Sequence, residues 1–304
     1  MSAPAPIPAS DPPLLRRMQP TDRDAIALLI HHSTNDYYRS IGRDAIFVGP
    51  PEDAAVFVDV YDAIGPDYGL VFEQDGELLG SCFVHPRETH VSLGIMNVAA
   101  AAQGKGVARQ LLARIVKDAG SRPVRLVSSC FNLDSYSLYS RAGFQPRGVV
   151  QDVLFAIPPI GPPPHASSLA VRDATPEDLP MIAEHVLVQT GLDRTADYAM
   201  MLDAGPEWTV LLTDGGVLAS CNTPAVKMIG PGAATDEAVM TTLLHAQLER
   251  LAGKTVVALV PSDARSLLAA AYDWGGRNVE LHVVQSNAAL PPARGVELGT
   301  FLPE

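Results

Sequence analysis

The sequence is poor in cysteine and in basic residues. Its 304 residues include only three cysteines, Cys82, Cys130 and Cys221, and none of them stands in a C-x-x-C pair. An odd number of widely spaced cysteines argues against a disulfide framework and indicates a reducing compartment. The sequence therefore predicts a cytoplasmic protein without disulfides, and it offers no ligand pattern for a metal ion.

Lysine and arginine number 22 against 34 aspartates and glutamates, so the formal net charge is −12. Nucleic acids and anionic membranes are polyanions, and this charge argues against both as partners while it permits a cationic substrate. The sequence also lacks an apolar run long enough to cross a bilayer. Residues 1–13 are rich in Ala and Pro and lack the charged start and apolar stretch of a secretory signal. We expect them to form a disordered arm.

The length allows two domains of about 150 residues each, and the sequence contains a weak internal repeat. An Asp-Gly hairpin signal followed by Ser-Cys occurs at 75–82 and again at 214–221, an offset of 139 residues. Tyr139 and Gly143 likewise recur as Tyr272 and Gly276, at an offset of 133. A stiff Pro-rich segment separates the two copies. These patterns predict a tandem arrangement of domains at 14–157 and 169–304, joined by a linker at 158–168.

The most informative segment lies between an apolar strand, 91–98, and a helix with apolar spacing that begins near Val107. The loop between them contains Gly104 and Gly106. Unshielded N–H groups at a helix start, together with the helix dipole, make a site for a pyrophosphate. A Walker A loop is a poor alternative, because Gly106 stands where Ser or Thr would follow Lys105. A dinucleotide fingerprint is also poor, because Arg109 stands at the third glycine position. A plain strand-to-helix turn is the remaining alternative.

A second motif follows at 132–144, after the apolar segment 124–129, which is typical of a buried strand. It begins with Asn132, an expected helix cap, continues through Ser135, Leu138 and Tyr139, and ends on Gly143-Phe144. A helix with a glycine stop and a core tyrosine would explain these residues without any ligand.

Taken together, the two motifs resemble the GNAT superfamily, the acyl-CoA-dependent N-acyltransferases. Gln103-x-x-Gly106-x-Ala108 is similar to the pyrophosphate signature of that family, and residues 132–144 are similar to its N-x-x-[AS]-x-x-[LF]-Y-x-x-x-G-F segment. One departure is the run Ala99–Ala102, where family members often carry Asp and Pro. The resemblance implies an α/β (α+β) fold with a mixed sheet, acetyl-CoA as co-substrate, and acyl transfer by direct attack of an amine.

The resemblance also implies roles for individual residues. Tyr139 would protonate the departing thiolate, and the backbone N–H of Val98 would stabilise the oxyanion of the thioester carbonyl. The cofactor-binding residues expected from the resemblance are Met96, Asn97, Val98, Gln103, Gly104, Lys105, Gly106, Val107, Ala108, Asn132 and Tyr139. By alternation along the strand, Met96 would share a face with His90, Ser92 and Gly94.

The general base is less well defined by the sequence. Glu88 and His90, near the strand that leads to the loop, are the predicted candidates. His85 and the helical segment 30–38, which contains His31, His32 and Asp36, are further options. A base supplied by a water chain is also open.

The second copy lacks the glycine loop. Asp236-Glu237 stand at the corresponding helix start, where carboxylates would occupy the N–H groups and repel a pyrophosphate. The sequence therefore predicts a degenerate second domain, one acyl-CoA per chain, and a small-molecule or peptide amine as acceptor. The alternatives are an acyl-CoA-binding sensor without activity, or a scaffold. The expected oligomeric state is monomer or homodimer.

The expected secondary structure follows from apolar periodicity and turn signals. Strands are expected near 14–18, 69–74, 78–85, 90–98, 123–129, 144–149 and 151–157, and helices near 22–32, 52–63, 106–119 and 133–142. In the second copy the clearest helices are expected at 177–189, 236–252 and 263–273. No element is assigned after Asn287.

Overall fold

The computed structural model of the protein describes residues 13–65 and 68–301. The first half contains β1 (Leu14–Arg17), α1 (Arg23–Ser40), α2 (Ala55–Ile64), β2 (Gly69–Gln74), β3 (Glu77–Pro86), β4 (Val91–Val98), α3 (Val107–Ala119), β5 (Val124–Ser129), α4 (Leu133–Arg141) and β6 (Gln145–Ala156). The second half contains β7 (Arg172–Asp173), α5 (Leu179–Thr190), α6 (Thr195–Asp203), β8 (Trp208–Thr213), β9 (Gly216–Asn222), β10 (Lys227–Ala234), α7 (Glu237–Arg250), β11 (Thr255–Pro261), α8 (Arg265–Asp273), β12 (Arg277–Ser286) and β13 (Val296–Leu298). The predicted α/β class with a mixed sheet is confirmed.

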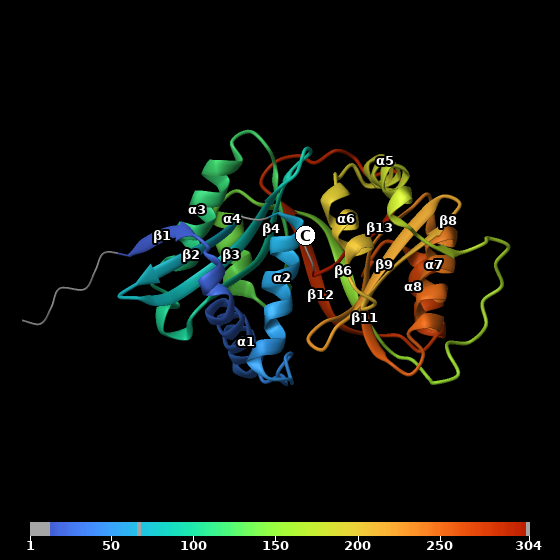
Figure 1. Ribbon diagram of the computed structural model, residues 1–304, viewed down its shortest axis with the longest axis horizontal. Helices are drawn as coiled ribbons and strands as arrows, with labels where there is room; N and C mark the ends of the chain where they lie inside the picture. The colour runs from blue at the N-terminus through green and yellow to red at the C-terminus, as the bar shows by residue number, and fades with distance from the viewer. Residues whose placement is uncertain (1–12, 66–67, 302–304) are drawn as a thin grey trace, which may run out of the picture.

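In the first half, helices cover both faces of the sheet (Figure 1). Side chains alternate between the faces along each strand. Val71 of β2 packs in a core with Ile26 of α1 and Val58 of α2. Its neighbours Leu70 and Phe72 point the other way, into a core built on α3. The apolar stripe of α3 supplies that second core with side chains that are at most 6% exposed: Val107, Leu111, Leu112, Ile115 and Ala119.

The two halves exchange their last long strands. Within the described residues the strand order is β1-β2-β3-β4-β5-β12-β6-β11-β10-β9-β8-β7, and β13 adds to β10. β12 of the second half therefore lies between β5 and β6, and β6 of the first half lies between β12 and β11. Both exchanged strands run antiparallel to their neighbours. One continuous sheet thus joins the two halves, and β6 and β12 cross its middle (Figure 1).

The expectation of two strands at 144–149 and 151–157 is wrong, because β6 is a single strand. Val150 pairs with Pro261 of β11 on one side and with His282 of β12 on the other, so the chain continues straight through this point. A turn at this point would have paired the two expected strands with each other. In the structure β12 of the second half is the strand that pairs with β6 on this side. Local periodicity gives no information about which distant strand fills a place in the sheet.

Two further contacts fix the halves against each other. One core contains Val58 and Tyr61 of α2 together with Met228 and Leu259 of the second half. The loop after β3 is held to α6 by a buried ion pair: Arg87 Nη2 lies 2.6 Å from Asp197 Oδ1, and the two side chains are 4% and 0% exposed. Separating such a pair leaves a buried charge without its partner, so the junction resists opening.

Several elements differ from expectation. The helix expected at 22–32 and the separate helical segment at 30–38 form one helix, α1, which extends to Ser40. No bounds were predicted for α6, although two helices are expected near the start of each copy, and β13 was not expected. β13 follows the unassigned tail and pairs with the segment 232–234 of β10. Both depend on long-range partners, which a periodicity argument does not detect.

Two buried histidines predict a pH-dependent stability. His85 is 2% exposed, and its Nε2 lies 2.9 Å from the carbonyl oxygen of Tyr61. Burial and the nearby charge of Arg87 lower the pKa of His85 to about 4, and burial with neighbouring arginines lowers the pKa of His90 to about 3. Below pH 6.5 the unfolded chain binds protons that these folded-state imidazoles exclude. We expect the free energy of unfolding to fall by about 2 kcal/mol per histidine between pH 7 and pH 5.

Urea unfolding across this pH range measures the effect. His85→Gln retains a donor for the Tyr61 carbonyl but does not titrate, so the variant should show a shallower pH dependence than the wild type. A wild-type stability that is constant from pH 7 to pH 5 would contradict the expectation.

Candidate active site

The loop between β4 and α3 has the backbone shape that an anion site needs. Gly104 and Gly106 have φ angles of +73° and +84°, a region that residues with a Cβ rarely adopt. Gly106 is the N-cap residue of α3 and provides no capping side chain. The first N–H groups of this 13-residue helix therefore have no side-chain partner, and an anion is a natural partner for them.

The equivalent helix start in the second half is occupied by protein groups. Asp236 caps α7, and its carboxylate accepts a hydrogen bond of 2.9 Å from the N–H of Val239. The neighbouring Glu237 accepts bonds from the N–H groups of Ser266 and Leu267 at the start of α8. The two halves thus have the same element order here but opposite electrostatics.

Tyr139 shares a hydrophobic core with the first residue of α3. Tyr139 of α4 is 6% exposed and belongs to the same core as Val107, and Met96 and Val98 pack against that core. Its hydroxyl forms no hydrogen bond to another described residue. Burial raises the pKa of Tyr139 far above its ordinary value, so the phenol stays protonated at neutral pH. Asn132 caps α4 as expected, with its Oδ1 accepting from the N–H of Ser135 at 2.9 Å.

β4 and β5 diverge towards the loop. These parallel strands pair at Val91 with Val124 and at Ser92 with Arg125, and no pair follows among the described residues. The opening between the strands leaves the edge of β4 near Met96 and Val98 without a strand partner on that side. An extended ligand arm can hydrogen-bond to such an edge.

A bulge changes the predicted faces of β4. The pairing with β3 shifts between Leu93 and Met96, so the alternation slips there. Gly94 faces the ring of Tyr61, whereas Met96 packs with Leu93 on the α3 side. The expectation that Met96 shares a face with His90, Ser92 and Gly94 is wrong, because a bulge adds a residue to one strand.

Glu88 and His90 lie at the opposite end of β4 from the glycine loop. His90 precedes the strand, and eight residues of extended chain separate it from Val98, roughly 25 Å. Both nitrogens of His90 are engaged, by Thr89 Oγ1 at 2.9 Å and Ser92 Oγ at 3.0 Å. The N–H of Glu88 donates to Asp193 of the second half at 3.2 Å. The structure thus places both candidates at the junction of the halves and does not bring them to Tyr139.

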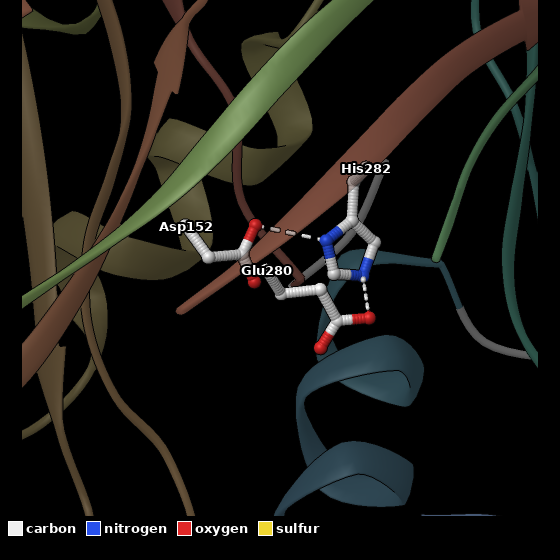
Figure 2. Close-up of side chains that lie close together, drawn as sticks. All are labelled: Asp152, Glu280 and His282. Atoms are coloured by element: carbon white, nitrogen blue, oxygen red, sulfur yellow. Dashed lines mark hydrogen bonds and ion pairs between the residues drawn. The ribbon is translucent and has the colours of Figure 1, made fainter. Parts of the chain in front are cut away.

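A second polar cluster was not expected from the sequence (Figure 2). Asp152 of β6 meets Glu280 and His282 of β12, and all three are buried. His282 Nδ1 lies 2.8 Å from Asp152 Oδ1, and Glu280 Oε2 accepts from Tyr38 Oη at 2.8 Å. Ser129 Oγ also donates to Glu280. The only signal in the sequence is the alternation of Glu280 and His282 within an apolar strand. Nothing local connects them to Asp152.

This cluster also has the composition of a possible cation site. One donor atom from each of Asp152, Glu280 and His282 lies within 4.8 Å of the others. In the structure, however, protein groups already hydrogen-bond to both carboxylates. Tyr38 and Ser129 donate to Glu280, and His282 bonds to Asp152. The arrangement therefore does not require a metal ion.

A surface hollow of about 700 Å³ lies in the second half, between α5 and β8. Met181, His185 and Leu212 are among the residues that line it. It contains none of the predicted site residues, and the candidate site described above is not connected with it.

Comparison with known proteins identifies the fold family. Residues 66–146, which include the glycine loop and Tyr139, match the family model described as the acetyltransferase (GNAT) domain. Over these residues the chain is similar to GNAT acetyltransferases. A mycothiol acetyltransferase of Cellulomonas flavigena is 35% identical over 121 residues, which cover 35% of this chain and 34% of that protein. The match thus spans about a third of the length of that relative.

Two solved structures share the GNAT fold along nearly the whole chain. A candidate acetyltransferase from Pyrococcus horikoshii has a TM-score of 0.77 at 16% identity, covering 96% of each chain. A tandem GNAT protein from the clavulanic acid biosynthesis pathway has a TM-score of 0.59 at 13% identity, covering 93% of this chain and 100% of that one. The predicted resemblance to the GNAT superfamily is thus confirmed for residues 66–146, and the fold of this second structure agrees with the predicted tandem form.

No helix formed by the described residues is both long and apolar enough to span a membrane.

Proposed function

We propose that the first half binds acetyl-CoA and transfers its acetyl group to a primary amine of a small molecule or peptide. The observation that carries this proposal is the uncapped start of α3, which lies in one core with Tyr139 and beside the diverging edge of β4. The sites for the pyrophosphate, the thioester arm and the proton donor would then follow one another along the bound cofactor.

We assign cofactor binding and oxyanion stabilisation to groups along this path. The N–H groups of Gln103 and Lys105 donate to the carbonyls of Ala100 and Ala102, so the other N–H groups of the segment 103–108 hold the pyrophosphate, with the positive end of the α3 dipole behind them. The pantetheine arm lies in the opening beside Met96 and Asn97 and passes the capped start of α4 at Asn132. The N–H of Val98 stabilises the oxyanion that forms on the thioester carbonyl.

Bond changes follow from this placement. The amine nitrogen attacks the thioester carbon, the C–N bond forms, and the C–S bond then breaks. Tyr139, which its raised pKa keeps protonated at neutral pH, donates its proton to the departing thiolate. Glu88 and His90 are the base candidates that the sequence supplies, although their positions at the far end of β4 favour neither.

One acetyl-CoA per chain is proposed, because Asp236 occupies the helix start of the second half. Calorimetric titration with acetyl-CoA tests both points together. Micromolar binding at one site per chain supports the proposal, whereas two sites would contradict the assignment of the second half. Absence of binding would favour a scaffold, and binding without acetyl transfer to any amine would favour a sensor.

The cell compartment proposed is the cytoplasm, in keeping with the three unpaired cysteines. The protein is proposed to act as a monomer or homodimer without nucleic acid or membrane partners.

Replacing Tyr139 with Phe should lower turnover roughly tenfold or more, because it removes the proton donor while preserving the ring. The affinity for acetyl-CoA should not change, since the hydroxyl has no described partner. Initial rates of CoA release and calorimetry measure the two effects separately.

Tyr136→Phe is the matched control, because it removes a hydroxyl from the same helix away from the core. The control should keep wild-type turnover. Equal turnover of Tyr139→Phe and wild type would mean that another group or a water molecule protonates the thiolate.

A further inference from the structure

The cluster of Asp152, Glu280 and His282 lies where the exchanged strands cross (Figure 2). The side chains belong to both halves and are at most 7% exposed. Within the described residues, no Lys or Arg side chain pairs with either carboxylate. Two carboxylates therefore share one imidazole in a buried site, and burying charge without a counter-ion is unfavourable. The cluster has the electrostatics of a receptor for a cation.

Helix α1 relates this cluster to β4. Ser33 and Thr34 of α1 accept hydrogen bonds of 2.7 and 3.3 Å from Asn97 Nδ2. One turn further along the same helix, Tyr38 donates to Glu280. With a rise of 1.5 Å per residue, four to five residues span about 6–7 Å of helix axis. The residues of α1 that contact Asn97 and Glu280 are therefore about one helical turn apart along the helix axis.

The strand register gives the same placement independently. The last β4–β5 pair is Ser92 with Arg125. Four residues further along each strand lie Met96 and Ser129, on opposite sides of the opening. Ser129 Oγ donates to Glu280. Glu280 thus contacts the end of β5, the strand on the far side of the opening from Met96.

A second buried group at this place lacks a partner. Asn97 is 8% exposed, and its Oδ1 forms no hydrogen bond within the described structure. A buried oxygen that accepts no hydrogen bond is unfavourable, so a ligand with a hydrogen-bond donor would be stabilised beside it. An ammonium group offers three N–H donors, which suits an amide oxygen together with a carboxylate.

We infer that this cluster receives the acceptor as an alkylammonium ion, and that Glu280 accepts the proton that the nitrogen must lose before it attacks. The inference rests on the proposed function and deepens it. It gives the second half a direct part in the reaction, through the strand it exchanges into the first half. The acceptor class is a primary alkylamine that is cationic in solution.

The proposed proton route runs through the cluster. Glu280 Oε1 takes a proton from the ammonium nitrogen and becomes a carboxylic acid. His282 Nε2 lies 3.9 Å from Glu280 Oε1, so it accepts that proton after the two side chains approach by about 1 Å. Asp152 accepts a hydrogen bond from His282 Nδ1–H and so keeps the lone pair on Nε2, and it then stabilises the imidazolium. The nitrogen loses two protons overall. One balances the proton that Tyr139 gives to sulfur, and the other leaves the site through His282.

The test compares two nucleophiles in wild type and Glu280→Gln. A simple alkylamine is protonated at neutral pH and needs the base, whereas hydroxylamine is largely unprotonated and does not. The variant should lose about 100-fold or more in kcat/KM for the alkylamine. Its kcat/KM for hydroxylamine should stay within about threefold of wild type, and its affinity for acetyl-CoA should not change.

Glu77→Gln is the matched control, because Glu77 is an exposed carboxylate at the start of β3. This variant should behave as wild type with both nucleophiles. If Glu280→Gln does not fold, His282→Asn replaces it. Asn retains a donor for Asp152 but removes the Nε2 acceptor, so the alkylamine reaction should slow about tenfold while the hydroxylamine reaction is maintained.

Three outcomes would overturn the inference alone: an unchanged alkylamine rate, an equal loss with both nucleophiles, or a wild-type activity that EDTA removes and Zn²⁺ restores. The last outcome would assign the cluster to a metal ion. A wild-type protein that does not bind acetyl-CoA, or acetylates neither nucleophile, would overturn the proposed function, and the inference with it.

Discussion

Gly106→Glu is expected to abolish acetyl-CoA binding, with a loss of at least about 100-fold in affinity. A carboxylate about 4 Å from a phosphate charge at an effective dielectric constant of about 20 is repelled by about 4 kcal/mol. That energy corresponds to about 1000-fold in the dissociation constant. The nearby Arg109 side chain, 3.6 Å from where the Cβ would be built, offsets part of the new charge, so the lower value is expected.

Gly106→Gln is the control that separates charge from backbone strain. Both variants place a Cβ at a φ of +84°, which costs about 1–2 kcal/mol for an L-residue. Neither Cβ clashes, because the nearest atom is at ordinary contact distance. The two variants should therefore lose similar stability in urea unfolding. Only the glutamate should eliminate binding in calorimetry.

Unchanged affinity in Gly106→Glu would remove the pyrophosphate assignment from the start of α3. An equal loss in the glutamine and glutamate variants would show that loop geometry, and not charge, determines the affinity.

Separation of the two halves is expected to unfold both. Residues 13–157 alone would expose both edges of β6, which otherwise bond to β11 and β12. They would also expose Val150, Val153, Phe155 and Ile157, all at most 7% exposed in the intact chain. Burial of four such side chains contributes about 6–12 kcal/mol, which is comparable to the whole stability of a domain.

Circular dichroism and gel filtration of the isolated segment measure this effect. The control is the full chain cut once inside the linker, at an inserted protease site beside the exposed Ile160. The cut keeps every strand present, so the nicked protein should stay folded and should elute as one complex. A folded, monomeric 13–157 segment would contradict the expectation and would support two independent domains at the boundaries predicted from sequence.

The sequence specifies the parts of the site that depend on neighbouring residues. Gly104 and Gly106 stand where the turn needs positive φ, and the apolar stripe of α3 follows directly. Asn132 caps α4 a few residues before Tyr139. All of these features depend on residues within about a dozen positions of each other. For this reason the strand, the loop, the two helices and the degenerate helix start at Asp236 follow from sequence patterns.

The tertiary structure decides what crosses between the halves. Tyr38 and Glu280 are 242 residues apart, and Asp152 and His282 are 130 apart. They meet only because β12 is inserted between β5 and β6. The same applies to His90, which resembles a base in the sequence but is buried at the junction.

The sequence by itself thus determined the fold, the glycine loop before α3 and the loss of that loop in the second half, because backbone geometry and helix capping depend on consecutive residues. The tertiary structure alone decided which strands complete each half and which carboxylate accepts hydrogen bonds from Tyr38 and Ser129. Strand pairing satisfies backbone hydrogen bonds with whichever partner is adjacent in space, and that partner has no signature in the local sequence.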